Sequence, residues 1–221
     1  MNTKQHILRC EELFDSYFEL IVKYNKKYNL TTIVDRPDVF KKHFEDSLLG
    51  MDLLPINCSV VDIGCGAGLP SLPLCIVRSD LQASLYDSVQ KKVNFCNIAI
   101  KDLGLADRVK AIHSRVEDIG KRESFDICVA RAVAKLNTLA EYALPLLKVG
   151  GCLLAYKSSD IEQELELVQK ILPQLGGQLQ QVKLMQLDQD TLRKIVVIKK
   201  LSATNAKYPR GKNLPRTNPL S

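Results

Sequence analysis

Two hydrophobic patterns divide the chain near residue 55. In the first part, apolar residues recur every three or four positions, which predicts helices. They are Ile7, Leu8, Leu13, Phe14, Phe18, Ile21 and Val22. A second helix is expected to start after Pro37, because the turn- and cap-forming residues 29–32 break the pattern before it. Residues 1–55 are therefore predicted to form a helical extension that packs on the rest of the chain.

From residue 58 onward, short apolar runs alternate with helical stretches. The predicted strands are 59–63, 83–86, 109–112, 127–130 and 152–155, and the predicted helices are 69–77, 90–103 and 136–147. This alternation is typical of a parallel sheet with helices on both faces. No helical pattern separates the last two strands, 179–185 and 194–200, which predicts an antiparallel pair. Residues 56–204 are thus expected to form an α/β core with a doubly wound, mostly parallel seven-stranded sheet.

Composition narrows the class of protein. The chain has 221 residues, of which 46% are hydrophobic and 25% charged, as in ordinary globular domains. No stretch is long enough to span a bilayer, and the polar N-terminus does not resemble a signal peptide. The seven cysteines contain no CxxC pair, so a disulfide framework or a zinc site is not expected. The sequence predicts a cytoplasmic protein with no membrane association and no bound metal.

Positive charge gathers towards the C-terminus. The net charge is +6, and no acidic residue follows Asp190. The basic residues beyond it are Arg193, Lys194, Lys199, Lys200, Lys207, Arg210, Lys212 and Arg216. Such a segment is typical of a protein with a polyanionic partner, most often nucleic acid, although a solubilising terminus has the same composition. Residues 205–221 are predicted to form a basic, proline-containing tail in extended conformation.

Residues 60–69 carry the strongest chemical signal. An apolar strand runs into Gly64, Gly66 and Gly68, and a predicted helix follows. Glycines let a ligand approach the backbone closely, and the helix N-terminus offers unpaired N–H groups. A tight turn without a ligand is the alternative, but three glycines directly after a strand favour a binding loop.

Two features of this loop favour S-adenosylmethionine over a dinucleotide. The G-x-G-x-x-G/A fingerprint fails, because its sixth position is Leu69 when counted from Gly64 and Ser71 when counted from Gly66. In addition, Asp62 stands at the end of the strand. A carboxylate there suits a ligand that carries an ammonium group, whereas it would repel a pyrophosphate.

Three further segments follow predicted strands and should border the same ligand. Asp87 lies about twenty residues after the loop, where a carboxylate can bind ribose hydroxyls or cap the next helix. Residues 114–118 should lie near an adenine ring, or else form an acidic helix N-terminus. Arg131 ends the fourth strand, where a carboxylate, the cofactor or a nucleic-acid phosphate could pair with it.

These motifs together resemble the bacterial 16S ribosomal RNA guanine-N7 methyltransferases, also called the glucose-inhibited division protein B family. The Gly loop alone indicates only a superfamily, while the flanking motifs are more specific. They are Asn29-Leu30-Thr31, His43 with Asp46-Ser47-Leu48, Asp87-Ser88 with Lys91-Lys92, Arg115 with Glu117, Asp126 with Arg131-Ala132-Val133-Ala134, Lys157, Arg193 and Tyr208-Pro209-Arg210. The resemblance extends over almost the whole chain.

The resemblance implies a class I S-adenosylmethionine-dependent methyltransferase fold and methylation of N7 of one guanine in 16S ribosomal RNA of the small subunit. It places cofactor-binding residues at Gly64, Leu69, Asp87, Ser88, Val116, Glu117 and Arg131, beside Asp62, Gly66 and Gly68 from the loop itself. Candidates for shaping the base pocket are Arg131, His43, Asp46, Ser47 and Asn29. For His43 and Asp46 the alternative is a structural pair in which each satisfies the other. Candidate RNA contacts are Lys157, Arg193, Lys194, Lys207, Arg210, Lys212 and Arg216.

Other classes of protein fit the sequence less well. A methyltransferase that acts on another RNA or a small molecule would share the cofactor loop, but a small-molecule enzyme has no use for a basic C-terminus. A nicotinamide-dependent oxidoreductase would need the fingerprint that fails at Leu69 and Ser71. A non-catalytic RNA-binding protein would not need Gly64, Asp87 and Glu117 together. The expected protein is a monomer.

Overall fold

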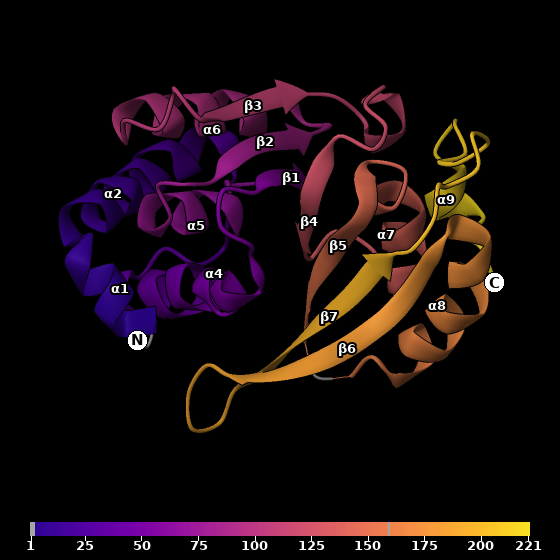
Figure 1. Ribbon diagram of the computed structural model, residues 1–221. Coiled ribbons are helices and arrows are strands. Elements are labelled where there is room, and N and C mark those ends of the chain that lie inside the picture. Colours follow the sequence, from indigo (N-terminus) through magenta and orange to yellow (C-terminus); the bar gives the residue numbers. More distant parts are fainter. Residues whose placement is uncertain (1–2, 159) are drawn as a thin grey trace.

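The computed structural model describes residues 3–158 and 160–221, and one seven-stranded sheet lies at its centre (Figure 1). The strands are β1 Ser59–Ile63, β2 Gln82–Asp87, β3 Val109–His113, β4 Phe125–Arg131, β5 Leu147–Lys157, β6 Gly177–Gln186 and β7 Leu192–Lys200. Their order is β3-β2-β1-β4-β5-β7-β6. Strands β1 to β5 pair in parallel, whereas β7 runs antiparallel to both β5 and β6. The predicted sheet and its antiparallel closing pair are confirmed.

Helices cover both faces of the sheet. The α-helices are α1 Thr3–Arg9, α2 Glu11–Tyr28, α3 Arg36–Val39, α4 Asp46–Leu48, α5 Ser71–Val77, α6 Gln90–Asp102, α7 Leu136–Ala143, α8 Glu162–Leu175 and α9 Leu214–Thr217. A π-helical segment, η1 Phe40–Glu45, joins α3 to α4, and η2 Met51–Leu53 and η3 Val116–Asp118 are 3-10 helices. Val60 of β1 packs with the core beside α2, α5 and α6, while Val61 and Ile63 pack with the core beside α7 and α8. A central strand buried on both faces explains the unbroken apolar run in the sequence.

The N-terminal helices lie on the same face as α5 and α6 (Figure 1). Phe14, Tyr17 and Ile21 of α2 are fully buried in the core that they share with β1 and β2. The Tyr17 hydroxyl donates a hydrogen bond to the carbonyl of Ala67, in the loop that follows β1. The helical extension thus holds this loop directly. Its boundary at residue 55, like that at residue 204, stays a prediction.

Two predicted elements differ from the structure on the far side of the sheet. Helix α7 was expected to reach residue 147, but it ends at Ala143, and β5 begins at Leu147. Pro145 explains the difference, because proline lacks the N–H that continues the helical hydrogen bonds. Helix α8 was not predicted, although its buried residues Val168, Ile171 and Leu175 follow a helical spacing.

The prediction of an extended C-terminal tail is wrong. Residues 205–221 fold back onto the core, where Tyr208 and Pro215 are buried and Leu214–Thr217 forms α9 beside α7 (Figure 1). The Arg122 guanidinium donates to the carbonyls of Thr204 and Tyr208, at 2.6 Å each. Tertiary hydrogen bonds thus fix a segment whose composition alone indicated a tail.

A buried ion pair anchors this segment. The Glu141 carboxylate is completely buried, and the Arg210 guanidinium donates to both of its oxygens at 2.8 Å. The backbone N–H of Arg210 donates to the same carboxylate at 2.9 Å. Removing one partner of such a pair leaves a buried charge without compensation.

We therefore expect Arg210→Ala to lower the free energy of unfolding by about 3 to 5 kcal/mol. Urea denaturation followed by circular dichroism measures this change. Lys207→Ala is the matched control, because Lys207 is exposed three residues away, and it should change stability by less than about 0.5 kcal/mol. Equal stability of Arg210→Ala and the unmodified protein would contradict this role of the pair.

Candidate functional site

The loop after β1 opens the site at the carboxyl ends of the parallel strands. Gly64, Gly66 and Gly68 have φ values of 72°, 57° and 86°, a region that L-residues with a side chain rarely adopt. A Cβ on Gly64 would lie 2.9 Å from Cγ2 of Val133, in the loop after β4. A Cβ on Gly68 would lie 2.4 Å from Cδ1 of Leu72. Glycine is thus required at both positions by conformation and by space.

Asp87 connects this loop to the loop after β2. One carboxylate oxygen accepts a hydrogen bond from the Gly66 N–H at 2.9 Å, and the other accepts from the Val89 N–H at 2.8 Å. Asp87 therefore positions the Gly loop and also braces the residue before α6, so part of the alternative capping role is present. Each carboxylate oxygen has a second lone pair for a ligand.

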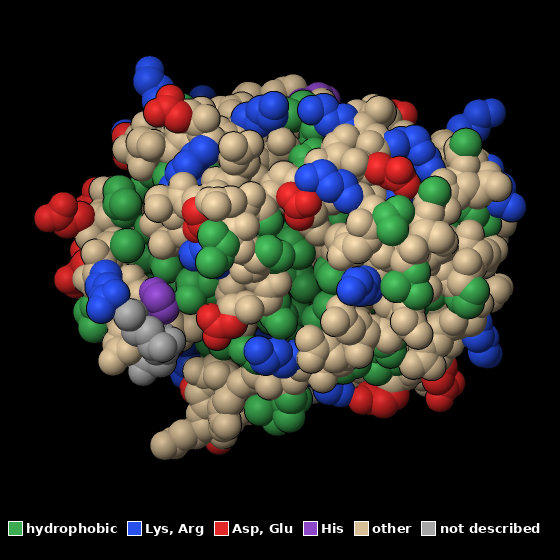
Figure 2. All heavy atoms as spheres, in the orientation of Figure 1, with side chains coloured by type: hydrophobic (Ala, Val, Ile, Leu, Met, Phe, Trp, Pro, Cys, Tyr) green, Lys and Arg blue, Asp and Glu red, His purple; other side chains and the backbone are tan. Residues whose placement is uncertain are grey.

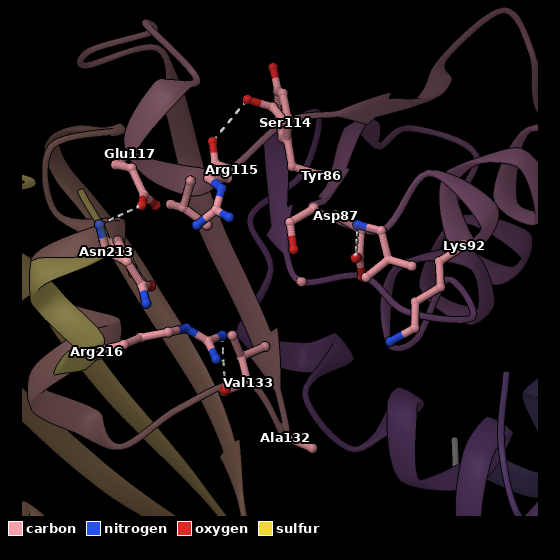
Figure 3. Close-up of a pocket in the computed structure, with 15 residues that line it drawn as sticks. Tyr86, Asp87, Lys92, Ser114, Arg115, Glu117, Ala132, Val133, Asn213 and Arg216 are labelled. Atoms are coloured by element: carbon pink, nitrogen blue, oxygen red, sulfur yellow. Dashed lines mark hydrogen bonds between the residues drawn. The ribbon is translucent and has the colours of Figure 1, made fainter. Parts of the chain in front are cut away.

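A cavity of about 420 Å³ lies beside the Gly loop, at the end of β2 and next to η3 (Figure 3). Five predicted cofactor residues line it: Gly64, Asp87, Ser88, Val116 and Glu117. Figure 3 shows Glu117, Asn213 and Arg216 on one side and Asp87 and Lys92 on the other. The predicted residues Asp62, Gly66, Gly68, Leu69 and Arg131 are not among its lining residues. Its volume suits a small organic ligand.

Sequence reasoning missed several residues that line this cavity. They are Tyr86, Val89, Tyr142 and Asn213, together with Lys92, Ala132 and Val133, which carried the family resemblance without an assigned role. Tyr142 lies on α7, and Asn213 precedes α9. No local sequence pattern marks either position. Asn213 reaches the cavity only because the C-terminal segment folds back onto the core.

Asp62 is buried without a partner behind the Gly loop. Its side chain is inaccessible, and neither carboxylate oxygen has a hydrogen-bond partner among the described residues. Burial raises the pKa of Asp62 to about 7, and two neighbours oppose this rise: Ser71, which is close but whose hydroxyl does not reach hydrogen-bond geometry, and the positive charge of Arg131. An unpartnered buried carboxylate is costly unless a cation completes it. This observation fits a ligand that carries an ammonium group.

A second cavity of about 460 Å³ adjoins the first, and Ala132 lines both. Four further predicted residues line it beside Arg131: His43, Asp46, Lys157 and Arg193. Ala132 has a φ of 57°, which is unusual for a residue with a side chain. The structure therefore brings together most of the residues that were predicted for a base pocket, although Asn29 and Ser47 line neither cavity.

Asp46 is the centre of the second cavity. Its carboxylate is almost fully buried and accepts from Arg131 Nη1 at 2.8 Å and from Arg193 Nε at 2.7 Å. The proposed pairing of His43 with Asp46 is therefore wrong. His43 Nε2 instead lies 2.8 Å from Thr31 Oγ1. Two guanidinium groups compete better than a neutral imidazole for a buried carboxylate.

The surroundings of His43 favour its neutral form. Burial lowers its pKa, and the nearby Arg131 guanidinium adds to this effect. Its Nδ1 atom has no hydrogen-bond partner within the part of the chain that the structure describes. His43 thus presents an uncharged ring at the second cavity.

Several predicted RNA contacts already have partners within the protein. The Lys157 ammonium lies 2.6 Å from Glu164, Lys194 lies 2.6 Å from Glu162, and Arg193 binds Asp46. Lys207 and Lys212 are exposed. Figure 2 shows Lys and Arg side chains spread over the whole face in view, with acidic side chains between them. Which of these cations contact RNA stays a prediction.

Neither a metal-binding cluster nor a membrane-spanning helix occurs within residues 3–158 and 160–221. These residues contain no group of three or more His, Cys, Asp or Glu side chains that could hold a metal ion. None of their helices has the length and hydropathy needed to cross a bilayer.

The family model described as rRNA small subunit methyltransferase G matches residues 10–193. The chain belongs to this family. Ribosomal RNA small subunit methyltransferase G of Desulforamulus reducens is 42% identical over 215 residues, which cover 94% of this chain and 89% of that protein. The protein of the same name from Lactobacillus johnsonii is 40% identical over 229 residues, which cover 100% of this chain and 93% of that one. The predicted family and the enzyme class, a methyltransferase, are confirmed.

A solved structure shares the fold at low sequence identity. The crystal structure of M. jannaschii TYW2 in complex with AdoMet matches with a TM-score of 0.58 and 17% identity, over 71% of this chain and 74% of that one. Together with the strand order, this likeness confirms the predicted fold class.

The buried carboxyl group of Asp62 leads to a prediction about stability and pH. Its pKa is 3.8 ordinarily and about 7 in the folded protein, so between these values only the unfolded chain loses the proton. Ionisation therefore costs stability as the pH rises from about 4 to about 7. Asp62→Asn removes this cost, and its stability advantage over the unmodified protein should grow across that range by up to about 4 kcal/mol and then level off. Urea denaturation of both proteins at several pH values measures it, and a difference independent of pH would contradict the assignment.

Proposed function

We propose that the protein transfers the methyl group of S-adenosylmethionine to N7 of one guanine in 16S ribosomal RNA, with the cofactor in the first cavity and the target base in the second. The observation that carries this proposal is the meeting of the two cavities at Ala132. Membership of the rRNA small subunit methyltransferase G family supports the RNA substrate and the methyl donor. The M. jannaschii protein, which shares this fold, was crystallised in complex with AdoMet, and this is consistent with the donor.

The first cavity has the groups that this cofactor needs. When bound, S-adenosylmethionine supplies a methyl group on a positively charged sulfur. Asp87 would accept from the ribose hydroxyls, and Glu117 would face the adenosine from the loop after β3. Asp62 does not line the cavity, but it lies in β1 two residues before Gly64 and its carboxylate has no hydrogen-bond partner among the described residues, so it would balance the charge of the ammonium group across the Gly loop. A Cβ on Gly66 would meet no atom closer than 4.0 Å, so the backbone here is open to a ligand.

The second cavity would hold the base with polar side chains that are already fixed by contacts within the protein. Asp46 fixes the guanidinium groups of Arg131 and Arg193, and Arg131 ends β4 directly before Ala132, which lines both cavities. Because a guanidinium that is already paired with a buried carboxylate loses little freedom on binding, this arrangement can orient a base. The contribution of these residues is alignment and exclusion of water.

No general base is needed for this reaction. Guanine N7 has a lone pair and no proton to lose, so His43 has no proton to accept. The lowered pKa of His43 favours a neutral ring at physiological pH. His43 would then line the pocket as an uncharged polar side chain. His43 would therefore shape the pocket rather than move a proton.

The balance of charges around the second cavity also suits a methylated base, which gains positive charge in the reaction. Methylation moves the charge of the sulfonium to the base, and a strongly cationic cavity would oppose this. Four basic and three acidic side chains line the second cavity, so its positive charge is largely matched although the whole chain has a net charge of +6. The remaining cations, Lys207 and Lys212 among them, would contact phosphates outside it.

The proposed substrate indicates where in the cell the reaction takes place. Ribosomal small subunits are cytoplasmic, and we place the protein there with them. We infer that the protein acts as a monomer.

Calorimetric titration with S-adenosylmethionine tests the cofactor site. The unmodified protein should bind it and should not bind NADH, while Gly64→Asp should lose binding, because the new side chain would collide with Val133 at a φ of 72°. Gly104→Asp is the matched control, since Gly104 has a φ of 67° but no atom lies within 4 Å of the position that a Cβ would take, and it should bind normally. Binding of NADH, or equal binding by Gly64→Asp, would contradict the proposal.

The position of methylation and its pH dependence test the chemistry. Small subunits that lack the modification should gain one methyl group at a guanine, which borohydride and aniline treatment detects because it cleaves RNA at N7-methylguanosine. The turnover number should change by less than about twofold between pH 7 and pH 9, since no proton leaves N7. His43→Gln should keep the same flat profile. A rate that rises tenfold per pH unit, or methylation at another atom, would contradict the mechanism.

A further inference from the structure

The C-terminal segment reaches the first cavity, although it lies outside the residues that the family model matches. That match ends at residue 193, whereas Asn213 and Arg216 line the cavity (Figure 3). Arg216 was predicted to contact RNA, because it belongs to the acid-free basic segment. Its position in the structure points to a different role.

Asn213 and Arg216 each hold one wall of the cavity. The backbone N–H of Asn213 donates to a carboxylate oxygen of Glu117 at 3.2 Å. The Arg216 guanidinium donates to the carbonyl of Val133 at 3.3 Å, and both contacts are visible in Figure 3. Glu117 belongs to η3 after β3, and Val133 to the loop after β4. The segment therefore joins two walls that come from separate strands.

The Val133 contact extends to the Gly loop. The side chain of Val133 lies against the Gly64 backbone, with Cγ2 at 2.9 Å from the position that a Cβ on Gly64 would take. Val133 thus packs directly on the Gly64 backbone. A shift of Val133 would alter the space beside the Gly loop, so the hydrogen bond from Arg216 helps to set the shape of the cavity.

The segment is held in place independently of these two contacts. Arg210 binds the buried Glu141, Thr138 of α7 donates to the Pro215 carbonyl at 2.8 Å, and Asn137 donates to the Leu220 carbonyl at 2.7 Å. These anchors lie on both sides of Asn213 and Arg216 in the chain. Asn213 and Arg216 are therefore presented to the cavity from a fixed support.

We infer that Arg216 is a positioning residue of the cofactor site, and that the segment sets the affinity for S-adenosylmethionine by holding Val133 through the Arg216 side chain and Glu117 through the backbone N–H of Asn213. This inference rests on the proposed function, which assigns the first cavity to the cofactor. The RNA role of Arg216 is then replaced by a role in the binding of the cofactor.

Calorimetric titration of Arg216→Ala without RNA tests the inference. Affinity for S-adenosylmethionine and for S-adenosylhomocysteine should fall by at least about fivefold each, because a hydrogen bond from a charged donor is lost. The ratio of the two affinities should stay the same within about twofold, since the effect passes through Val133. Arg216→Lys keeps a donor and should recover part of the loss. Lys207→Ala, which removes an exposed cation of the same segment, is the matched control and should bind both ligands normally.

Three outcomes would overturn the inference. The first is unchanged affinity in Arg216→Ala. The second is tighter binding of S-adenosylmethionine relative to S-adenosylhomocysteine, because removal of a repelling charge would then explain the result. The third is a normal cofactor affinity combined with equal loss of RNA binding in Arg216→Ala and Lys207→Ala, which would restore the RNA role. If the unmodified protein did not bind S-adenosylmethionine at all, the proposed function would fail instead. Thermal unfolding of each variant identifies any loss of fold, and Arg216→Lys carries the test if Arg216→Ala unfolds.

Discussion

The reversal of the chain after β1 is the constraint on which the rest of the site depends. Within five residues the backbone adopts positive φ at Gly64, Gly66 and Gly68, a conformation that glycine adopts without strain and that neighbouring contacts fix in one arrangement. Asp87 holds the Gly66 N–H, and Tyr17 of the helical extension holds the carbonyl of Ala67. The strand order places β2 and β4 on either side of β1, so their following loops reach this turn from both sides.

Three buried carboxylates show how the fold separates stability from function. Asp46 and Glu141 are each bound by arginine, and in both cases the partner comes from a segment distant in the sequence. Such pairs hold remote parts of the chain in register, since breaking one leaves a buried charge. Asp62 has no such partner among the described residues. A buried group that lowers the stability of the fold and has no stabilising partner within it is expected at a binding site.

Local sequence patterns predict individual strands, helices and loops. They do not predict contacts between residues that are distant in the sequence. Strand β1 and the Gly loop followed from an apolar run and its glycines. The expected alternative in which His43 and Asp46 satisfy each other was wrong. The observed partners of Asp46 lie 85 and 147 residues away, and no local pattern reports them. The C-terminal segment was expected to be extended from its prolines and charge, but anchors such as Arg210 to Glu141 are tertiary and override that composition. The same folding back explains why Asn213 was missed.

The loop after β4 connects the two cavities through three consecutive residues. Arg131 is held by Asp46 on the side of the second cavity, Val133 packs on Gly64 on the side of the first, and Ala132 between them has a φ of 57°. Transfer of a methyl group requires donor and acceptor on one axis, and without proton transfer the alignment carries most of the catalysis. Because the same short loop supports both walls, a displacement of it would move them together. The strained conformation of Ala132 is thus expected to persist, since contacts on both sides fix it.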